Sequence, residues 1–371
     1  MLLDYIEETF RGRSVLRDKL RFSLPLLVIL TVRMAYVILL YLQLSLEGKL
    51  SSWLNLFSAW DSNYYLSIAS AWYPAHNFPY WSFFPLYPAL IRILHNSGAP
   101  RLLCAFMIAT TFGLLSIPLF QKVSSNYLTA DTAIQCTILY FLVPPVFVFS
   151  AVNYTEPLFL FFSLLSWQLN LERRNLLTAV SATLCALTRP DGLLIMIPIA
   201  YYHMKSRDFK KLGYLLIPIC TLSGWLYYGY LMTGGLIPSI AWRLWRTENV
   251  VRIENSLTEL MSGNPNGMHG LLPYSGLIVV SVSFLVVSAF LLTRVWRIDD
   301  SLFLYSSLTI ATILVTGAII AFRSFPRLAA FVFPLGLTLH SRKMWVVALA
   351  IFILLILDYF AWRAFLTDSF F

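Results

Sequence analysis

Long apolar runs separated by short polar segments dominate the chain. About 20 apolar residues suffice for a helix to cross a bilayer, and such runs cover residues 22–46, 102–121, 131–150, 154–170, 213–233, 270–293, 301–322, 325–340 and 344–365. A further run, residues 176–202, is interrupted at LTRPDGLL, where Pro190 lacks a backbone donor and Asp-Gly favours a turn. It fits either one kinked helix or two short helices joined by a hairpin.

The distribution of Lys and Arg decides between these alternatives and orients the chain. Cytoplasmic loops of membrane proteins carry an excess of these residues, and the loop that follows residue 202, HMKSRDFKKLG, holds four of them. Placing that loop in the cytoplasm requires two short helices over residues 176–202. We therefore predict an all-α polytopic membrane protein of one domain, residues 1–371, with about eleven crossings and a cytoplasmic N-terminal segment, residues 1–21.

The remaining loops fall on the opposite face, which is extracytoplasmic or lumenal. The first outer loop, residues 47–101, is too long for a simple connector. Its apolar positions recur at helical spacing and are Phe57, Trp60, Tyr64, Ile68 and Trp72. Because Trp and Tyr favour the membrane interface, we expect interfacial helices there. The second outer loop, residues 234–269, alternates Trp and Arg before a glycine-rich turn, which is typical of a helix and a mobile lid over a site.

Composition and charge limit the class of protein further. Of 371 residues, 58% are hydrophobic and 12% are charged, which excludes a soluble domain. The net charge of +9 indicates contact with anionic lipid head groups of the bilayer, because there is no long basic run and no motif typical of nucleic-acid binding. The four cysteines lie in apolar runs and the five histidines are scattered. We predict no metal and no cofactor, although Asp61 and Glu156 could together hold a divalent ion.

Six charged residues on the outer face are candidates for a site, since ionisable groups near membrane depth are costly and usually functional. They are Asp61, Glu156, Arg189, Asp191, Arg323 and Arg327. Each also has a structural interpretation. Ser58-x-x-Asp61 matches a capping box, Glu156 stands beside Pro157 where a helix macrodipole favours an acid, and the arginines could extend to lipid head groups.

Acids and arginines on one outer face suit the transfer of a sugar from a lipid phosphate. Arginine forks match phosphate oxygens, and a carboxylate beside an incoming hydroxyl can act as general base. Phosphate is a good leaving group, so one catalytic acid is sufficient. We assign Asp61 as the base and Arg189 and Arg327 as phosphate ligands. The other predicted substrate-binding residues are Trp60, Tyr65, Glu156, Asp191 and Arg323.

Four motifs in this order, WDSNYYLSIA, FFPLYPALIR, NYTEPLF and LTRPDGLL, resemble the PIG-V-like mannosyltransferases. That family includes the second mannosyltransferase of GPI-anchor assembly and its prokaryotic relatives, within the GT-C glycosyltransferases. The resemblance covers roughly residues 55–195 and extends more loosely to RLAAFVFP. It implies a GT-C fold and a polyprenyl- or dolichyl-phosphate mannose donor, with Asp61 of the WD motif as the catalytic residue. The implied acceptor is a glycolipid or lipid-linked glycan.

Three other functions remain open from the sequence. The chain could be a GT-C transferase of another sugar, such as glucose or aminoarabinose, or a non-catalytic partner in a glycosylation complex. It could also be a lipid or sugar transporter. Transporters place polar residues near the bilayer midplane, often in inverted repeats. Because no internal repeat is visible and the polar clusters gather toward one face, the enzyme is favoured.

Overall fold

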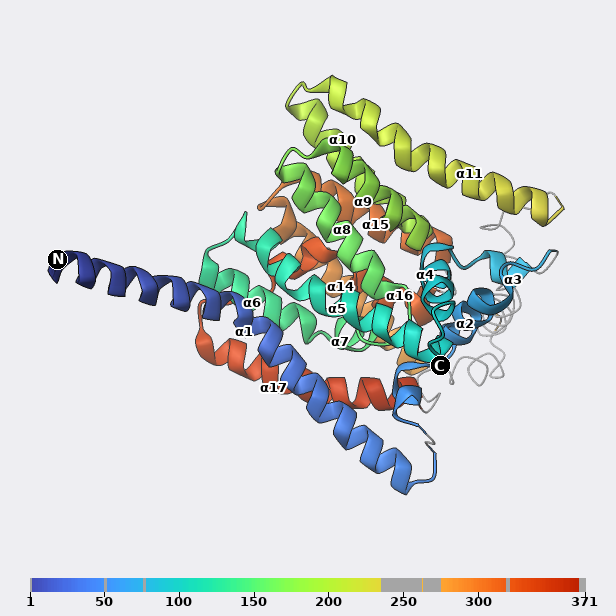
Figure 1. The fold of residues 1–371 in the computed structure, drawn as a ribbon, viewed down its shortest axis with the longest axis horizontal. Helices are drawn as coiled ribbons and strands as arrows, with labels where there is room; N and C mark the ends of the chain where they lie inside the picture. The colour runs from blue at the N-terminus through green and yellow to red at the C-terminus, as the bar shows by residue number, and fades with distance from the viewer. Residues whose placement is uncertain are drawn as a thin grey trace.

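The computed structural model describes residues 2–49, 52–75, 78–234, 262, 275–317 and 321–366 (Figure 1). Every regular element in these ranges is a helix. This confirms the predicted all-α class. Four segments are long and apolar enough to cross a membrane: Ser23–Leu46, Arg101–Ser125, Phe209–Met232 and Met344–Leu366. The chain is therefore a helical membrane protein, while the count of eleven crossings and the GT-C arrangement stay predictions.

The long segments belong to α1 (Leu2–Leu46), α5 (Arg101–Ser125), the 3₁₀ helix η3 (Phe209–Leu215) with α11 (Leu216–Met232), and α17 (Met344–Leu366). The predicted cytoplasmic segment 1–21 is helical from Leu2 and continuous with the first span. Further helices are α6 (Ala130–Phe141), α7 (Pro144–Phe149), α8 (Glu156–Leu171), α9 (Asn175–Thr188), α10 (Met196–Lys205), α14 (Ser275–Trp296), α15 (Asp300–Gly317) and α16 (Ala321–Ala330). Two more 3₁₀ helices are η2 (Pro190–Ile195) and η5 (Phe333–Thr338).

Prolines explain where the helices depart from the predicted runs. The run 131–150 is divided into α6 and α7, because Pro144 and Pro145 have no amide with which to continue α6. The run 325–340 is likewise not one helix, since α16 ends at Ala330 and η5 begins before Pro334. The run 176–202 breaks at Arg189 into α9, η2 and α10, which agrees with the predicted pair of short helices.

The first outer loop contains the helices expected of it. They are η1 (Trp53–Phe57), α2 (Asp61–Ala71), α3 (Phe78–Trp81) and α4 (Leu86–His95). Figure 1 shows α2, α3 and α4 together at one end of the molecule, opposite the turn between α10 and α11. The second outer loop, 234–269, lies outside the described residues except at positions 234 and 262.

Helix α8 forms the centre of the helical body. It packs between α5 and α9, and it is buried along almost its whole length. A buried hydrogen bond between two hydroxyl groups joins α8 to α9, where Ser166 Oγ donates to Ser181 Oγ at 3.0 Å. The first residue of α8 is Glu156, so this largely buried helix presents a carboxylate at its N-terminus.

Candidate functional site

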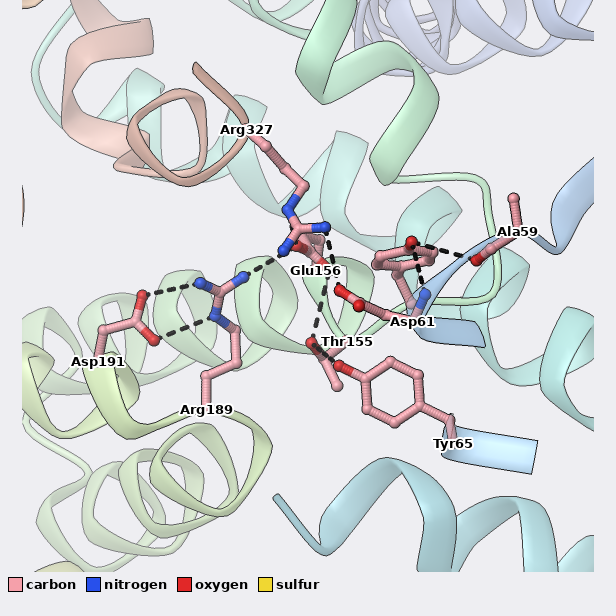
Figure 2. A network of polar contacts seen from close by, with 9 residues as sticks. Ala59, Asp61, Tyr65, Thr155, Glu156, Arg189, Asp191 and Arg327 are labelled. Atoms are coloured by element: carbon pink, nitrogen blue, oxygen red, sulfur yellow. Dashed lines mark hydrogen bonds and ion pairs between the residues drawn. The ribbon is translucent and has the colours of Figure 1, made fainter. Parts of the chain in front are cut away.

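Five charged side chains from four distant segments form one network in which the signs alternate (Figure 2). Arg327 Nη1 donates to Asp61 Oδ2 at 3.3 Å, and Arg327 Nε lies 3.1 Å from Glu156 Oε1. Arg189 Nη1 donates to the same Glu156 oxygen at 3.0 Å. Arg189 also binds Asp191 through two bonds, Nε to Oδ1 at 3.1 Å and Nη2 to Oδ2 at 3.2 Å. The structure thus assembles five of the six predicted charged residues.

Asp61 is the first residue of α2, but its carboxylate is directed away from that helix toward Arg327. The amide of Asp61 donates to Tyr154 Oη at 3.1 Å, and Tyr154 in turn donates to the Ala59 carbonyl at 3.2 Å. The capping interpretation through Ser58 is wrong, because the N-cap position is Trp60, whose side chain makes no capping hydrogen bond, and the first amide of α2 donates to Tyr154 instead. The carboxylate of Asp61 is available for another role.

Trp60 adopts a backbone conformation that a large L-residue rarely takes, with φ 45° and ψ −108°. The amide of Ser62 donates to the Ala59 carbonyl across this residue, which closes a tight turn directly before Asp61. Such strain costs about 1–3 kcal/mol and persists only where packing enforces it. Here the indole of Trp60 packs edge-on against Phe365 of α17 at 5.1 Å between ring centroids. The side chain of Trp60 therefore packs against Phe365, a buried residue of the protein core.

Glu156 is the bridge of the network, and its side chain is 1% exposed. A buried carboxylate is stable only when it is paired and hydrogen-bonded. Its Oε1 contacts both guanidinium groups, and its Oε2 accepts a long bond of 3.5 Å from Thr155 Oγ1. Glu156 therefore holds Arg189 and Arg327 at one place, in addition to its position at the start of α8.

Arg189 connects α9 to η2, as the C-cap of the first and the N-cap of the second. Its side chain is 12% exposed and lies over the Phe159 ring at 5.2 Å. The two bonds to Asp191 fix the orientation of the guanidinium plane. Such paired bonds are the geometry that Arg favours with a carboxylate. The snorkelling interpretation does not fit Arg189, because its guanidinium is directed inward onto two carboxylates.

Arg327 comes from α16 and lies over the rings of Phe149 and Tyr154, each 5.3 Å from the guanidinium carbon. Cations favour this position over an aromatic face. Its Nε has no hydrogen-bond acceptor in the described part of the chain, so the contact with Glu156 is an ion pair without hydrogen-bond geometry. Arg323 lies on the same helix, but its side chain is outside the described residues.

Tyr65 lies one turn after Asp61 and is buried. Its hydroxyl contacts Thr155 Oγ1 at 3.2 Å, so α2 meets the start of α8 at two places. Burial raises the pKa of Tyr65, and the nearby charges of Asp61 and Glu156 raise it further. Tyr65 is therefore a neutral hydroxyl at physiological pH, and its position suits orientation of Thr155 and Glu156.

Three residues of the site were not among the sequence-predicted candidates. Tyr154 and Thr155 lie in the NYTEPLF motif beside Glu156, and Phe149 ends α7. Tyr154 and Thr155 could have been predicted from the sequence, because they directly precede Glu156 in that motif. Nothing in the local sequence distinguishes Phe149 from the other buried aromatic residues, because its role depends on Arg327, which comes from a distant helix.

Three carboxylates face two guanidinium groups in this network, so both arginines are already engaged. Among the described residues, no group of three or more His, Cys, Asp or Glu side chains could hold a metal ion. The arrangement offers a carboxylate for proton transfer beside two guanidinium groups, which an anionic group would contact in competition with the carboxylates that now engage them. No family model and no curated protein matches the sequence.

Proposed function

We propose that this protein is a membrane glycosyltransferase of the PIG-V-like, GT-C type. It transfers mannose from a polyprenyl or dolichyl phosphate donor to a glycolipid or lipid-linked glycan on the extracytoplasmic or lumenal face. The observation that carries the proposal is the contact of Asp61 with Arg327, across 266 positions of sequence, within a network that also contains Arg189. A base and two phosphate-binding forks are the groups that this transfer requires.

In the proposed reaction, an acceptor hydroxyl attacks the anomeric carbon of the mannosyl phosphate. The new bond joins the acceptor oxygen to that carbon, and the bond from the carbon to the phosphate oxygen breaks with its electron pair on the phosphate. Asp61 takes the hydroxyl proton, and the configuration at the anomeric carbon inverts. Arg189 and Arg327 stabilise the charge that develops on the leaving phosphate. No second carboxylic acid is needed to protonate it.

The existing ion pairs indicate how donor binding would prepare the base. Arg327 is shared between Asp61 and Glu156, and its contact with Asp61 is the longer of the two at 3.3 Å. Glu156 is enclosed and keeps both arginines in place. A donor phosphate would compete with Asp61 for Arg327, because a guanidinium group can bind phosphate through two N–H groups, whereas Asp61 accepts from Nη1 alone. Asp61 would then face the acceptor hydroxyl.

The positions of the charged residues favour this enzyme over a transporter. Asp61 begins α2, Glu156 begins α8, and Arg189 lies between α9 and η2. Transporters place their polar groups near the bilayer midplane, often in inverted repeats, and no internal repeat is visible in this sequence. Groups at helix ends suit a donor that enters from the lipid and an acceptor that arrives from the aqueous side.

The direct test uses purified protein, labelled polyprenyl-phosphate mannose and membrane lipids, with the product identified by mass spectrometry. We expect labelled mannose in a glycolipid, and transfer slower by about 10²-fold or more with Asp61→Asn. Asp300→Asn is a matched control, because Asp300 is an exposed carboxylate paired with Lys205 away from the network. Parallel reactions with glucose and aminoarabinose donors identify the sugar. Failure to transfer any of the three sugars would overturn the proposed function.

A further inference from the structure

Two ionisable residues lie at membrane depth outside the network described above. Arg33 of α1 is 6% exposed and Asp358 of α17 is fully buried, and both belong to segments apolar enough to span a bilayer. A charged side chain in the middle of such a segment is costly, and natural proteins retain one mainly where it has a partner or a function. Neither residue has a role in the proposed proton transfer.

Arg33 contacts the end of α7. Its Nη2 donates to the Phe147 carbonyl at 3.2 Å and to Ser150 Oγ, and its guanidinium lies over the Phe147 ring at 5.4 Å. Ser150 is the C-cap of α7 and the first residue of the segment 150–155, which leads to Glu156. Arg33 of the first span is thus hydrogen-bonded to the end of α7, where the segment 150–155 begins.

The segment 150–155 carries the contacts on which the site depends. The Tyr154 hydroxyl accepts from the amide of Asp61, and the Thr155 hydroxyl contacts that of Tyr65. Glu156 follows the segment directly. Helix α5 closes on the same segment, because a Cβ at Gly113 would lie 1.9 Å from the Ser150 carbonyl oxygen. Ser150 is therefore confined between α1 and α5, and a shift of its position would be transmitted to the network.

Asp358 faces the same region from α17. Trp362, one turn later on that helix, packs edge-on against the Phe147 ring at 5.8 Å. Both carboxylate oxygens of Asp358 and the Nε of Arg33 are buried without a hydrogen-bond partner in the described part of the chain. Asp358 therefore makes no hydrogen bond with Arg33, and the contacts that fix Arg33 are those with Phe147 and Ser150.

We propose that Arg33 is a positioning residue for the site. It ties the first helical span to the end of α7 and so sets the segment 150–155. The consequence for turnover rests on the proposed function, whereas the positioning does not.

The positioning is tested by hydrogen–deuterium exchange in Arg33→Lys. Lysine keeps the charge and supports the fold, but it lacks the fork that reaches both the Phe147 carbonyl and the Ser150 hydroxyl. We expect faster exchange over residues 150–156 and unchanged exchange over the later turns of α8. Unchanged exchange over 150–156 would overturn the positioning role, whatever the substrate. Arg363→Lys, at a partly exposed Arg of α17, is the matched control.

Turnover gives the second readout for Arg33→Lys. A misplaced site loses rate more than affinity, so we expect kcat to fall about 10-fold with the KM for the donor within about twofold of wild type. Unaltered kcat in an active protein would contradict a link between Arg33 and the site. Absence of transfer in the wild type would instead refute the proposed function and leave the exchange result as the test of this inference.

Discussion

At the scale of single residues, the carboxylate of Asp61 is the group on which the proposed reaction depends. Asp61→Asn keeps the size of the side chain and an oxygen that can accept from Arg327. Folding should therefore survive, whereas an amide cannot take and hold the acceptor proton, so turnover should fall by about 10²-fold or more. Transfer rate and thermal unfolding of the same preparation measure both effects. Near-normal transfer would remove Asp61 as the base.

Glu156 differs from Asp61 because it is enclosed and bridges two cations. Glu156→Gln would leave Arg189 and Arg327 close together without the charge between them. Breaking one side of a buried ion pair costs about 3–5 kcal/mol. We therefore expect a large fall in Tm together with loss of donor binding, unlike the selective loss of rate in Asp61→Asn. A stable Glu156→Gln protein would show that the bridge does not hold the arginines.

At the scale of elements, the contact of η2 with α9 sets Arg189 and Asp191. A Cβ at Gly192 would lie 2.2 Å from the Cys185 carbonyl oxygen, and backbone atoms cannot yield as a flexible side chain can. Gly192→Ala must therefore move η2 away from α9, and overpacking of this kind costs about 1–3 kcal/mol. We expect a lower Tm and reduced transfer. Gly213→Ala is the control, because a Cβ there has no neighbour within 4 Å. Equal Tm values and equal transfer in Gly192→Ala and Gly213→Ala would contradict the close approach of η2 to α9.

At the scale of the whole molecule, the excess of Lys and Arg in certain loops predicts which face carries the site. A cysteine at Asn63, an exposed position of α2, should react with an impermeant thiol reagent from outside or from the lumen. A cysteine at exposed Ser206, after α10, should not. Cys220→Ser provides the background, because Cys220 is the one exposed native cysteine in the described residues. The opposite labelling pattern would invert the topology.

The sequence by itself determined the membrane class, most of the helices and the five charged residues that form the network. Apolar runs and prolines act over neighbouring residues, so α1, α5, α11, α17 and the break at Arg189 followed from local pattern. The charged candidates stood out because ionisable groups are rare in so apolar a chain.

Only the tertiary structure decided how those residues are paired. The bond between Asp61 and Arg327 crosses 266 positions, and that between Arg33 and Ser150 crosses 117. No local pattern encodes such contacts, since they depend on how separate helices pack. For the same reason the sequence showed Glu156 as the start of a helix, whereas packing of α8 among its neighbours enclosed it between two arginines. Burial made that charge dependent on partners that come from distant parts of the chain.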